Sequence, residues 1–255
     1  MLTQYHRPDT LEAALDLLAR PDTIPLGGGS VINSPAFTAA YAADFAVVDL
    51  QALGLNHIQK KNNHLETGAT VTLQQLLEDE HVPGALRRAI ELESAINLRH
   101  VATLAGTLIA CDGRSPFATA MLALDAHLAV SDGRSSRAIA LGDFLPLREL
   151  PHRLATAVTL PLKAQLAFEH VARTPADRPI VCAALARWPS GRTRLALGGY
   201  GKAPLLAMDA PEAGGLETAA RNAFYEAGDA WASAEYRAGV AAILAGRCLQ
   251  KLSVA

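Results

Sequence analysis

Apolar and polar positions follow helical and strand periods in alternating stretches of the chain. Apolar residues recur at helical spacing from Leu11 to Leu18, and Pro21 ends that helix. The same spacing predicts further helices at 73–77, 86–92, 116–124 and 234–249. Short apolar stretches bounded by turn residues predict strands at 23–26, 45–50, 64–69, 127–130 and 137–139. Short helices interleaved with strands predict an α+β fold.

Several local details of these elements are also predicted. Asp9 and Glu12 have capping-box spacing, with Thr10 as a competing cap. Thr72 and Gln75 form a second capping box. The segment 96–107 is predicted to be mostly extended. The helix at 234–249 is expected to direct three apolar residues inward, namely Val240, Ile243 and Leu244.

The pattern changes after about residue 155. Four consecutive strands are predicted at 156–160, 165–171, 180–187 and 192–197, and two helices close the chain. Prolines cluster just before and after this change. We therefore expect a first domain at 1–158, with sub-parts of about 1–55 and 56–158, and a C-terminal domain at 159–255.

Composition narrows the possible functions. The 255 residues are 50% hydrophobic with a net charge of -2, which suits a globular protein and gives no basic field for nucleic acid or an anionic membrane. No apolar stretch approaches the roughly 18 residues of a membrane span. The first residues do not resemble a secretory signal, so a cytoplasmic location is expected. Cys111, Cys182 and Cys248 are isolated, so neither an iron–sulfur cluster nor a metal site is expected in this chain.

Two segments of small residues could bind phosphate. The first is Gly27-Gly28-Gly29-Ser30, which follows a predicted strand and could present backbone N–H groups to an anion. Taken alone, the glycine run is better explained as a tight strand-to-helix turn, and Ile32 breaks the dinucleotide fingerprint that starts at Gly27. The second is 103–107, where small residues could instead serve close packing. No catalytic nucleophile or general base can be named.

Taken in order along the chain, these segments resemble one known family. The opening residues 4–15 are similar to the pattern Y-x-R-P-x-x-L-x-E-A-L, and Leu26–Ser30 resembles a first flavin-diphosphate loop, A-G-G-x-S. Residues 101–107 resemble the second loop, V-A-T-I-G-G-N, and 123–126 fit the segment after it. The segments 196–199 and 232–237 resemble a strand end and the start of the last helix. The family is that of FAD-binding subunits of molybdenum hydroxylases of the carbon monoxide dehydrogenase and xanthine dehydrogenase type.

The resemblance implies a two-part FAD-binding domain of the vanillyl-alcohol-oxidase (PCMH) type, followed by a small C-terminal α+β domain. It implies electron transfer from a [2Fe-2S] small subunit through FAD to an acceptor, in a complex with a molybdenum-cofactor large subunit. This chain would then be one part of a multi-subunit oxidoreductase. The implied cofactor-binding residues are Leu26, Gly27, Gly28, Gly29, Ser30, Thr103, Ala105, Gly106 and Thr107.

Three positions depart from the family pattern. Ala105 replaces a glycine, Thr107 replaces an asparagine or aspartate, and Pro116 stands where relatives carry an aspartate that can reach the cofactor. The segment after Phe144 is also shorter than in relatives. These departures favour an alternative, in which the chain is a scaffold subunit of the same fold that binds FAD weakly or not at all.

Overall fold

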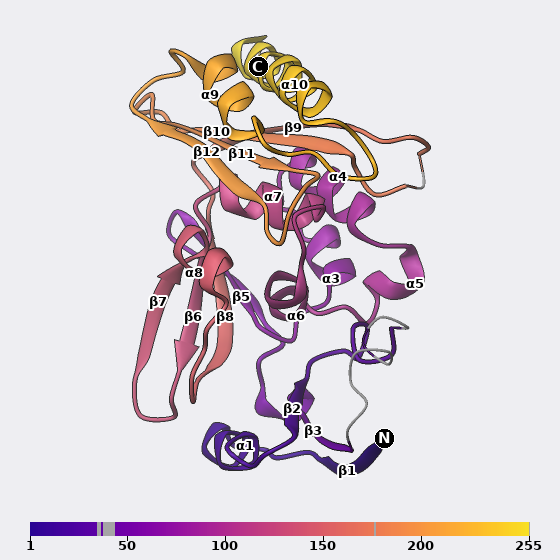
Figure 1. The fold of residues 1–255 in the computed structure, drawn as a ribbon. Coiled ribbons are helices and arrows are strands. Elements are labelled where there is room, and N and C mark those ends of the chain that lie inside the picture. Colours follow the sequence, from indigo (N-terminus) through magenta and orange to yellow (C-terminus); the bar gives the residue numbers. More distant parts are fainter. Residues whose placement is uncertain (35–36, 38–43, 176, 255) are drawn as a thin grey trace.

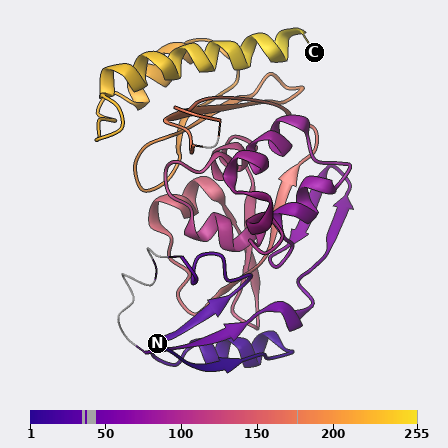
Figure 2. The same ribbon diagram turned by 90° about the vertical axis from the view of Figure 1, so that its right-hand side faces the viewer.

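The computed structural model describes residues 1–34, 37, 44–175 and 177–254. Its strands form three separate sheets, and helices pack between and over them, in agreement with the predicted α+β class. Figure 1 shows the three-stranded sheet with α1 at one end, the four-stranded sheet with α9 and α10 at the other, and further helices between. The chain therefore begins at one end of an elongated molecule and ends at the other (Figures 1 and 2).

The three-stranded sheet is parallel and has the order β1-β3-β2. Its strands are β1 (Leu2–His6), β2 (Thr23–Leu26) and β3 (Phe45–Asp49), and it is accompanied by α1 (Leu11–Leu18) and the short 3-10 helix η1 (Gln51–Leu53). Thr10 caps α1 by accepting a hydrogen bond from the backbone N–H of Ala13, so the competing cap is the one used. Buried Ala14, Val48 and Leu50 join this layer to Leu154 in the next sheet.

The five-stranded sheet is antiparallel with the order β4-β5-β8-β6-β7. Its strands are β4 (Ile58–Lys61), β5 (His64–Gly68), β6 (His127–Ser131), β7 (Ser136–Ala140) and β8 (Leu154–Pro161). The predicted boundary near residue 158 falls inside β8, a strand paired on both edges. The division of the chain near residue 158 stays a prediction.

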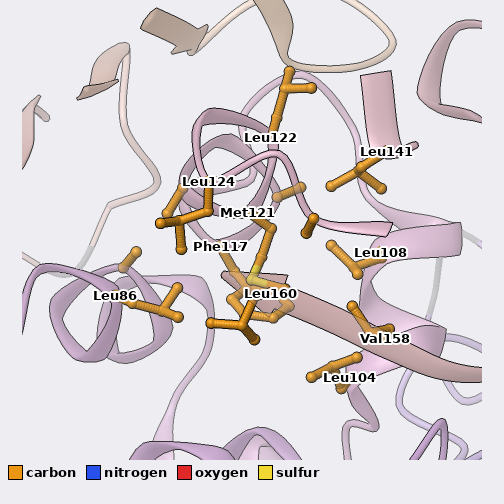
Figure 3. Close-up of a cluster of buried hydrophobic side chains, with 14 of the residues drawn as sticks. Leu86, Leu104, Leu108, Phe117, Met121, Leu122, Leu124, Leu141, Val158 and Leu160 are labelled. Atoms are coloured by element: carbon orange, nitrogen blue, oxygen red, sulfur yellow. The ribbon is translucent and has the colours of Figure 1, made fainter. Parts of the chain in front are cut away.

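The helices of the middle layer carry the main hydrophobic core. They are α3 (Leu73–Glu78), α4 (Gly84–Glu93), α5 (Ile96–Arg99), α6 (Leu104–Ala110), α7 (Pro116–Ala123) and α8 (Leu141–Leu147). Figure 3 shows side chains from α4, α6 and α7 meeting those of Val158 and Leu160 from β8. Every residue of α7 is buried, in agreement with a sequence in which Thr119 is the one polar residue.

The C-terminal sheet is antiparallel with the order β12-β11-β10-β9. Its strands are β9 (Gln165–Val171), β10 (Val181–Arg187), β11 (Thr193–Gly198) and β12 (Leu205–Ala210), with α9 (Leu216–Ala223) and α10 (Ala234–Val254) on one face. Along β10, Cys182 and Ala184 belong to the middle-layer core, whereas Ala183 and Leu185 belong to the core under α9 and α10. The sheet is therefore covered on both faces.

Two predictions about local structure are wrong, and one strand is missed. The segment 96–107 is largely helical rather than extended, because it forms α5 and the start of α6. Ile243 points outward and is 57% exposed, whereas Leu244 is buried as predicted. The strand β12 is missed, because its exposed and half-buried residues follow no regular alternation and so give only a weak strand signal.

Two properties of the described residues bear on function. None of the helices in the described ranges combines the length and the apolar character needed to cross a bilayer. Within these ranges, no group of three or more histidine, cysteine, aspartate and glutamate residues could hold a metal ion. The three cysteines are free and buried.

Candidate functional site

The glycine segment forms a tight loop directly after β2. The segment after β3 holds the first residues of this loop. The backbone N–H of Leu50 donates to the Leu26 carbonyl at 3.0 Å, and the side-chain amide of Gln51 donates to the Gly27 carbonyl at 2.6 Å. Gly29 has a φ of 76°, a left-handed conformation that favours glycine. The loop thus turns sharply while its start stays fixed to the three-stranded sheet.

The second small-residue segment is the first turn of α6. Thr103 is the N-cap, and its hydroxyl accepts from the N–H of Gly106 at 3.3 Å. The N–H of Ala105 donates to the Ala69 carbonyl at 3.3 Å, which ties the turn to the chain after β5. The hydroxyl of Thr107 donates to the Thr103 carbonyl at 2.8 Å, so its proton is already used within the helix.

The two segments pack directly against each other. A Cβ atom added to Gly28 would lie 1.5 Å from the carbonyl oxygen of Val101, and one added to Gly27 would lie 2.5 Å from the Thr103 hydroxyl. A side chain at either position therefore collides with the other loop. Close packing, considered above only for the second segment, is a requirement of the first as well.

A partly open cavity of about 220 Å³, the more enclosed of two and called the enclosed cavity below, lies between these loops and the five-stranded sheet. Its wall is almost entirely apolar. One polar exception is the Thr70 hydroxyl, which is buried and has no hydrogen-bond partner among the residues that the structure describes. The backbone N–H groups of Gly28, Gly29 and Ser30 donate no hydrogen bond to any described residue. The residues around this enclosed cavity include Ile24–Val31, Leu50, Ala69, Thr70, Thr103, Ala105, Gly106, Ile109, Ala110, Leu154 and Ala155.

A second, more polar cavity of about 270 Å³ lies on the other side of the glycine loop. Ser30, Val31 and Ala110 border both cavities, so the two adjoin along the loop. The buried hydroxyl oxygen of Ser94 lacks a partner here, as that of Thr70 does in the enclosed cavity. The other residues around this polar cavity are Leu73, Glu93, Leu98, Ala102, Thr107, Cys111, Asp112 and Arg178.

Charged side chains in its wall distinguish the polar cavity from the enclosed cavity. Arg178 donates hydrogen bonds to both carboxylate oxygens of Asp112, with Nη1 to Oδ2 at 2.9 Å. Burial favours the neutral acid of Asp112, but the hydrogen bonds and charge of Arg178 outweigh it and hold its pKa below the ordinary value. Burial raises the pKa of the Cys111 thiol to about 11, so this group stays neutral near pH 7. It is therefore a poor nucleophile.

The C-terminal sheet holds the polar cavity's wall in place. The N–H of Gly113 donates to the Gly201 carbonyl at 2.9 Å, and the N–H of Gly199 donates back to Gly113 at 2.6 Å. Arg114 donates to the carbonyls of Pro179 and Arg178 at 3.1 and 2.8 Å. The strand end 198–199 therefore supports the loop that follows α6.

All nine residues predicted from the sequence lie around these two cavities. Eight border the enclosed cavity, and Thr107 borders the polar one. The sequence reasoning missed the polar groups brought in from elsewhere, namely Thr70, Glu93, Ser94, Asp112 and Arg178. Each is a single residue with no motif around it, so no sequence signal identifies it.

Comparison with known proteins places these observations in a family. Residues 1–163 match the family described as the FAD binding domain in molybdopterin dehydrogenase, and this range includes both loops. The Escherichia coli K12 protein YgfM, itself uncharacterized, is 29% identical over 252 residues, which cover 96% of this chain and 94% of YgfM. The glyceraldehyde dehydrogenase medium chain of Sulfolobus acidocaldarius is 24% identical over 220 residues, 80% of this chain and 78% of that one.

Solved structures share the fold over nearly the whole chain. A chain of the carbon monoxide dehydrogenase from Hydrogenophaga pseudoflava, in a form that lacks the Mo-pyranopterin moiety of the molybdenum cofactor, superposes with a TM-score of 0.83 at 20% identity. The similarity covers 98% of this chain and 96% of that one. A chain of quinoline 2-oxidoreductase from Pseudomonas putida 86 gives a TM-score of 0.79 at 23% identity, over 97% and 95% of the two chains.

Proposed function

Because this chain belongs to the family of FAD-binding domains of molybdopterin dehydrogenases, we propose that it binds one FAD across the two adjoining cavities and transfers electrons within a molybdenum hydroxylase. The observation that carries this proposal is the set of unpaired donors at the glycine loop. Three consecutive backbone N–H groups there have no partner among the described residues. A diphosphate would accept from such groups, and their dipoles would offset its charge.

The glycine loop and the first turn of α6 would hold the diphosphate between them. The proposed contacts are the nine residues 26–30, 103 and 105–107, which face the cavities from the two segments. No lysine or arginine borders the enclosed cavity in the described part of the chain, so hydrogen-bond donors rather than cations would meet the phosphates. The buried hydroxyls of Thr70 and Ser94, which lack partners, fit a ligand that supplies acceptors or donors on both sides of the loop.

The two cavities differ in polarity, and this difference suggests which end of FAD each cavity holds. The enclosed cavity is apolar with one free hydroxyl, which suits the adenine end, a flat ring that serves only as an anchor. The polar cavity is more open and contains carboxyl and guanidinium groups, which suits the redox-active isoalloxazine ring. We therefore place the ring beside the C-terminal sheet, where an electron donor outside this chain can approach it.

When bound, FAD supplies the redox chemistry, and the protein supplies position and electrostatics. We propose that the electrons reach FAD from another subunit. A [2Fe-2S] small subunit and a molybdenum-cofactor large subunit are the proposed partners, since solved structures of the same fold are of molybdenum enzymes. The electron acceptor is left open.

Co-purification tests the proposed partnership. A tagged copy of this chain, expressed in its native host, is expected to bring down an iron–sulfur subunit and a molybdenum subunit in equal amounts. Mass spectrometry would identify the partners, and metal analysis would detect molybdenum and iron. Isolation of the chain alone, with FAD bound, would contradict the partnership while leaving cofactor binding intact.

The alternative, a scaffold of the same fold without FAD, has specific support. The Thr107 hydroxyl already donates to the Thr103 carbonyl, and Pro116 has no side-chain acceptor for the cofactor. Isolation of a colourless chain together with both partners would favour this alternative.

The unpaired hydroxyl of Thr70 gives a first prediction. Thr70→Val is expected to stabilise the FAD-free protein by about 1 kcal/mol, because it removes a buried polar atom without a partner. The same change should weaken FAD binding about 3- to 10-fold, since a hydrogen bond to the ligand is lost. Thermal unfolding and FAD titration of the two proteins would measure both effects.

Thr67→Val is the matched control. The Thr67 hydroxyl is also buried and unpaired, but Thr67 borders neither cavity. This variant should gain stability without any change in FAD affinity. Equal FAD affinities for wild type and Thr70→Val would show that the Thr70 hydroxyl does not face the ligand.

A further inference from the structure

Glu93 places a carboxyl group in the wall of the polar cavity. It is the last residue of α4, and its Oε2 atom accepts hydrogen bonds from the Ser115 hydroxyl at 2.7 Å and from the N–H of Phe117 at 3.0 Å. These donors belong to the beginning of α7, so the carboxyl group joins α4 to α7. No hydrogen bond to Oε1 is found within the described residues, although Glu93 borders the cavity.

Pro116 lies between Ser115 and Phe117, the two residues that donate hydrogen bonds to Glu93. A proline there offers neither a carboxylate nor an N–H group. The carboxyl group beside this turn thus comes from a different helix, α4.

The groups that face Glu93 leave it without a direct cationic partner. Both carboxylate oxygens of Asp112 accept from Arg178, so this arginine is already paired and acts on Glu93 only through its charge. Among the described residues, Asp112 and the neutral thiols of Cys111 and Cys182 are the other titratable groups that interact with Glu93. Burial is the main cause that raises the pKa of Glu93, and the two hydrogen bonds only partly oppose it.

We infer that Glu93 contacts the polar edge of the isoalloxazine ring through Oε1 and tunes the reduction potential of the flavin. This inference rests on the proposed binding of FAD across the two cavities. An ionised carboxylate beside the ring disfavours the addition of electrons, because like charges repel more strongly in a partly buried site. A protonated carboxyl group imposes no such penalty. Glu93 therefore lowers the potential increasingly as pH rises through its pKa.

The test compares Glu93→Gln with the wild-type full chain, both loaded with FAD. Glutamine has nearly the same shape and keeps an acceptor oxygen for Ser115, but it carries no charge. We expect the flavin potential of Glu93→Gln to exceed that of the wild type at pH 8, and this difference to shrink at pH 5. The flavin absorption bands should shift as well. Glu91→Gln, an exposed change on the same helix, should match the wild type in both measurements.

Each outcome decides between the possible roles of Glu93. If Glu93 only fastens α4 to α7, Glu93→Gln would lower the melting temperature and leave the potential and the spectrum unchanged, which overturns the inference. A potential difference that stays constant between pH 5 and pH 8 would also overturn it. In both cases FAD remains bound, so the proposed function survives. Failure of the wild-type chain to take up FAD would refute the proposed function and, with it, this inference.

Discussion

Gly28→Ala is expected to abolish tight FAD binding and to destabilise the fold at the same time. The added Cβ would lie 1.5 Å from the Val101 carbonyl oxygen, which belongs to the backbone and cannot rotate away. The two loops must therefore separate. Overpacking of this kind costs about 1–3 kcal/mol of folding free energy. A similar loss of binding free energy corresponds to a roughly 10- to 100-fold weaker affinity for FAD.

Two further glycine variants control for this result. Gly84→Ala adds a methyl group where no atom lies within 4 Å, so both stability and FAD affinity should stay close to the wild-type values. Gly29→Ala is expected to have an intermediate effect, since its left-handed backbone costs an alanine about 1 kcal/mol. Urea unfolding and FAD titration of the three variants would establish the order. A Gly28→Ala protein with wild-type stability and affinity would contradict the direct packing of the two loops.

Arg237→Met is expected to lower the free energy of unfolding by about 3 kcal/mol or more, because it leaves several buried acceptors without donors. The Arg237 side chain is fully buried and donates to three carbonyls, those of Ile180, Ala227 and Ala232. It also pairs with Asp229 at 2.8 Å. Methionine fills a similar volume but offers no hydrogen bond.

Arg247→Met is the matched control, because Arg247 is exposed on the same helix and forms no ion pair in the described part of the chain. Chemical denaturation should show little change for this variant. A loss of less than about 1 kcal/mol in Arg237→Met relative to Arg247→Met would mean that the buried carbonyls find other donors.

The effect of Arg237→Met should extend to the cofactor site. Asp229 accepts from the N–H of Trp231 at 2.7 Å, and the Trp231 ring stacks 4.5 Å from the guanidinium groups of both Arg114 and Arg173. Arg114 belongs to the loop that forms part of the polar cavity's wall. Loss of the ion pair between Arg237 and Asp229 should therefore weaken FAD binding and also destabilise the C-terminal sheet.

The family and most of the fold could be predicted from the sequence because their signals are local. Glycine loops, capping boxes and apolar periods each depend on a few adjacent residues. Thr72 and Gln75 form the predicted capping box, and Pro116 begins α7 as predicted. The match of residues 1–163 confirms the predicted family and its cofactor, FAD.

The remaining features depend on contacts between distant segments. The requirement for glycine at position 28 comes from the carbonyl of Val101, and a glycine run alone cannot distinguish such packing from phosphate binding. The Glu93 side chain acquires its setting only when α4 meets α7. Segment 96–107 was misread because its helices are only four and seven residues long, too short to show a helical period.

Titration of the purified, FAD-free chain with FAD tests the central claim most directly. Flavin absorption after removal of unbound FAD, together with quenching of protein fluorescence, would give the stoichiometry and affinity. We expect saturable binding of one FAD per chain, which Gly28→Ala weakens and Gly84→Ala preserves. Absence of saturable binding in the wild-type chain, or equal binding by Gly28→Ala, would contradict the proposed cofactor site.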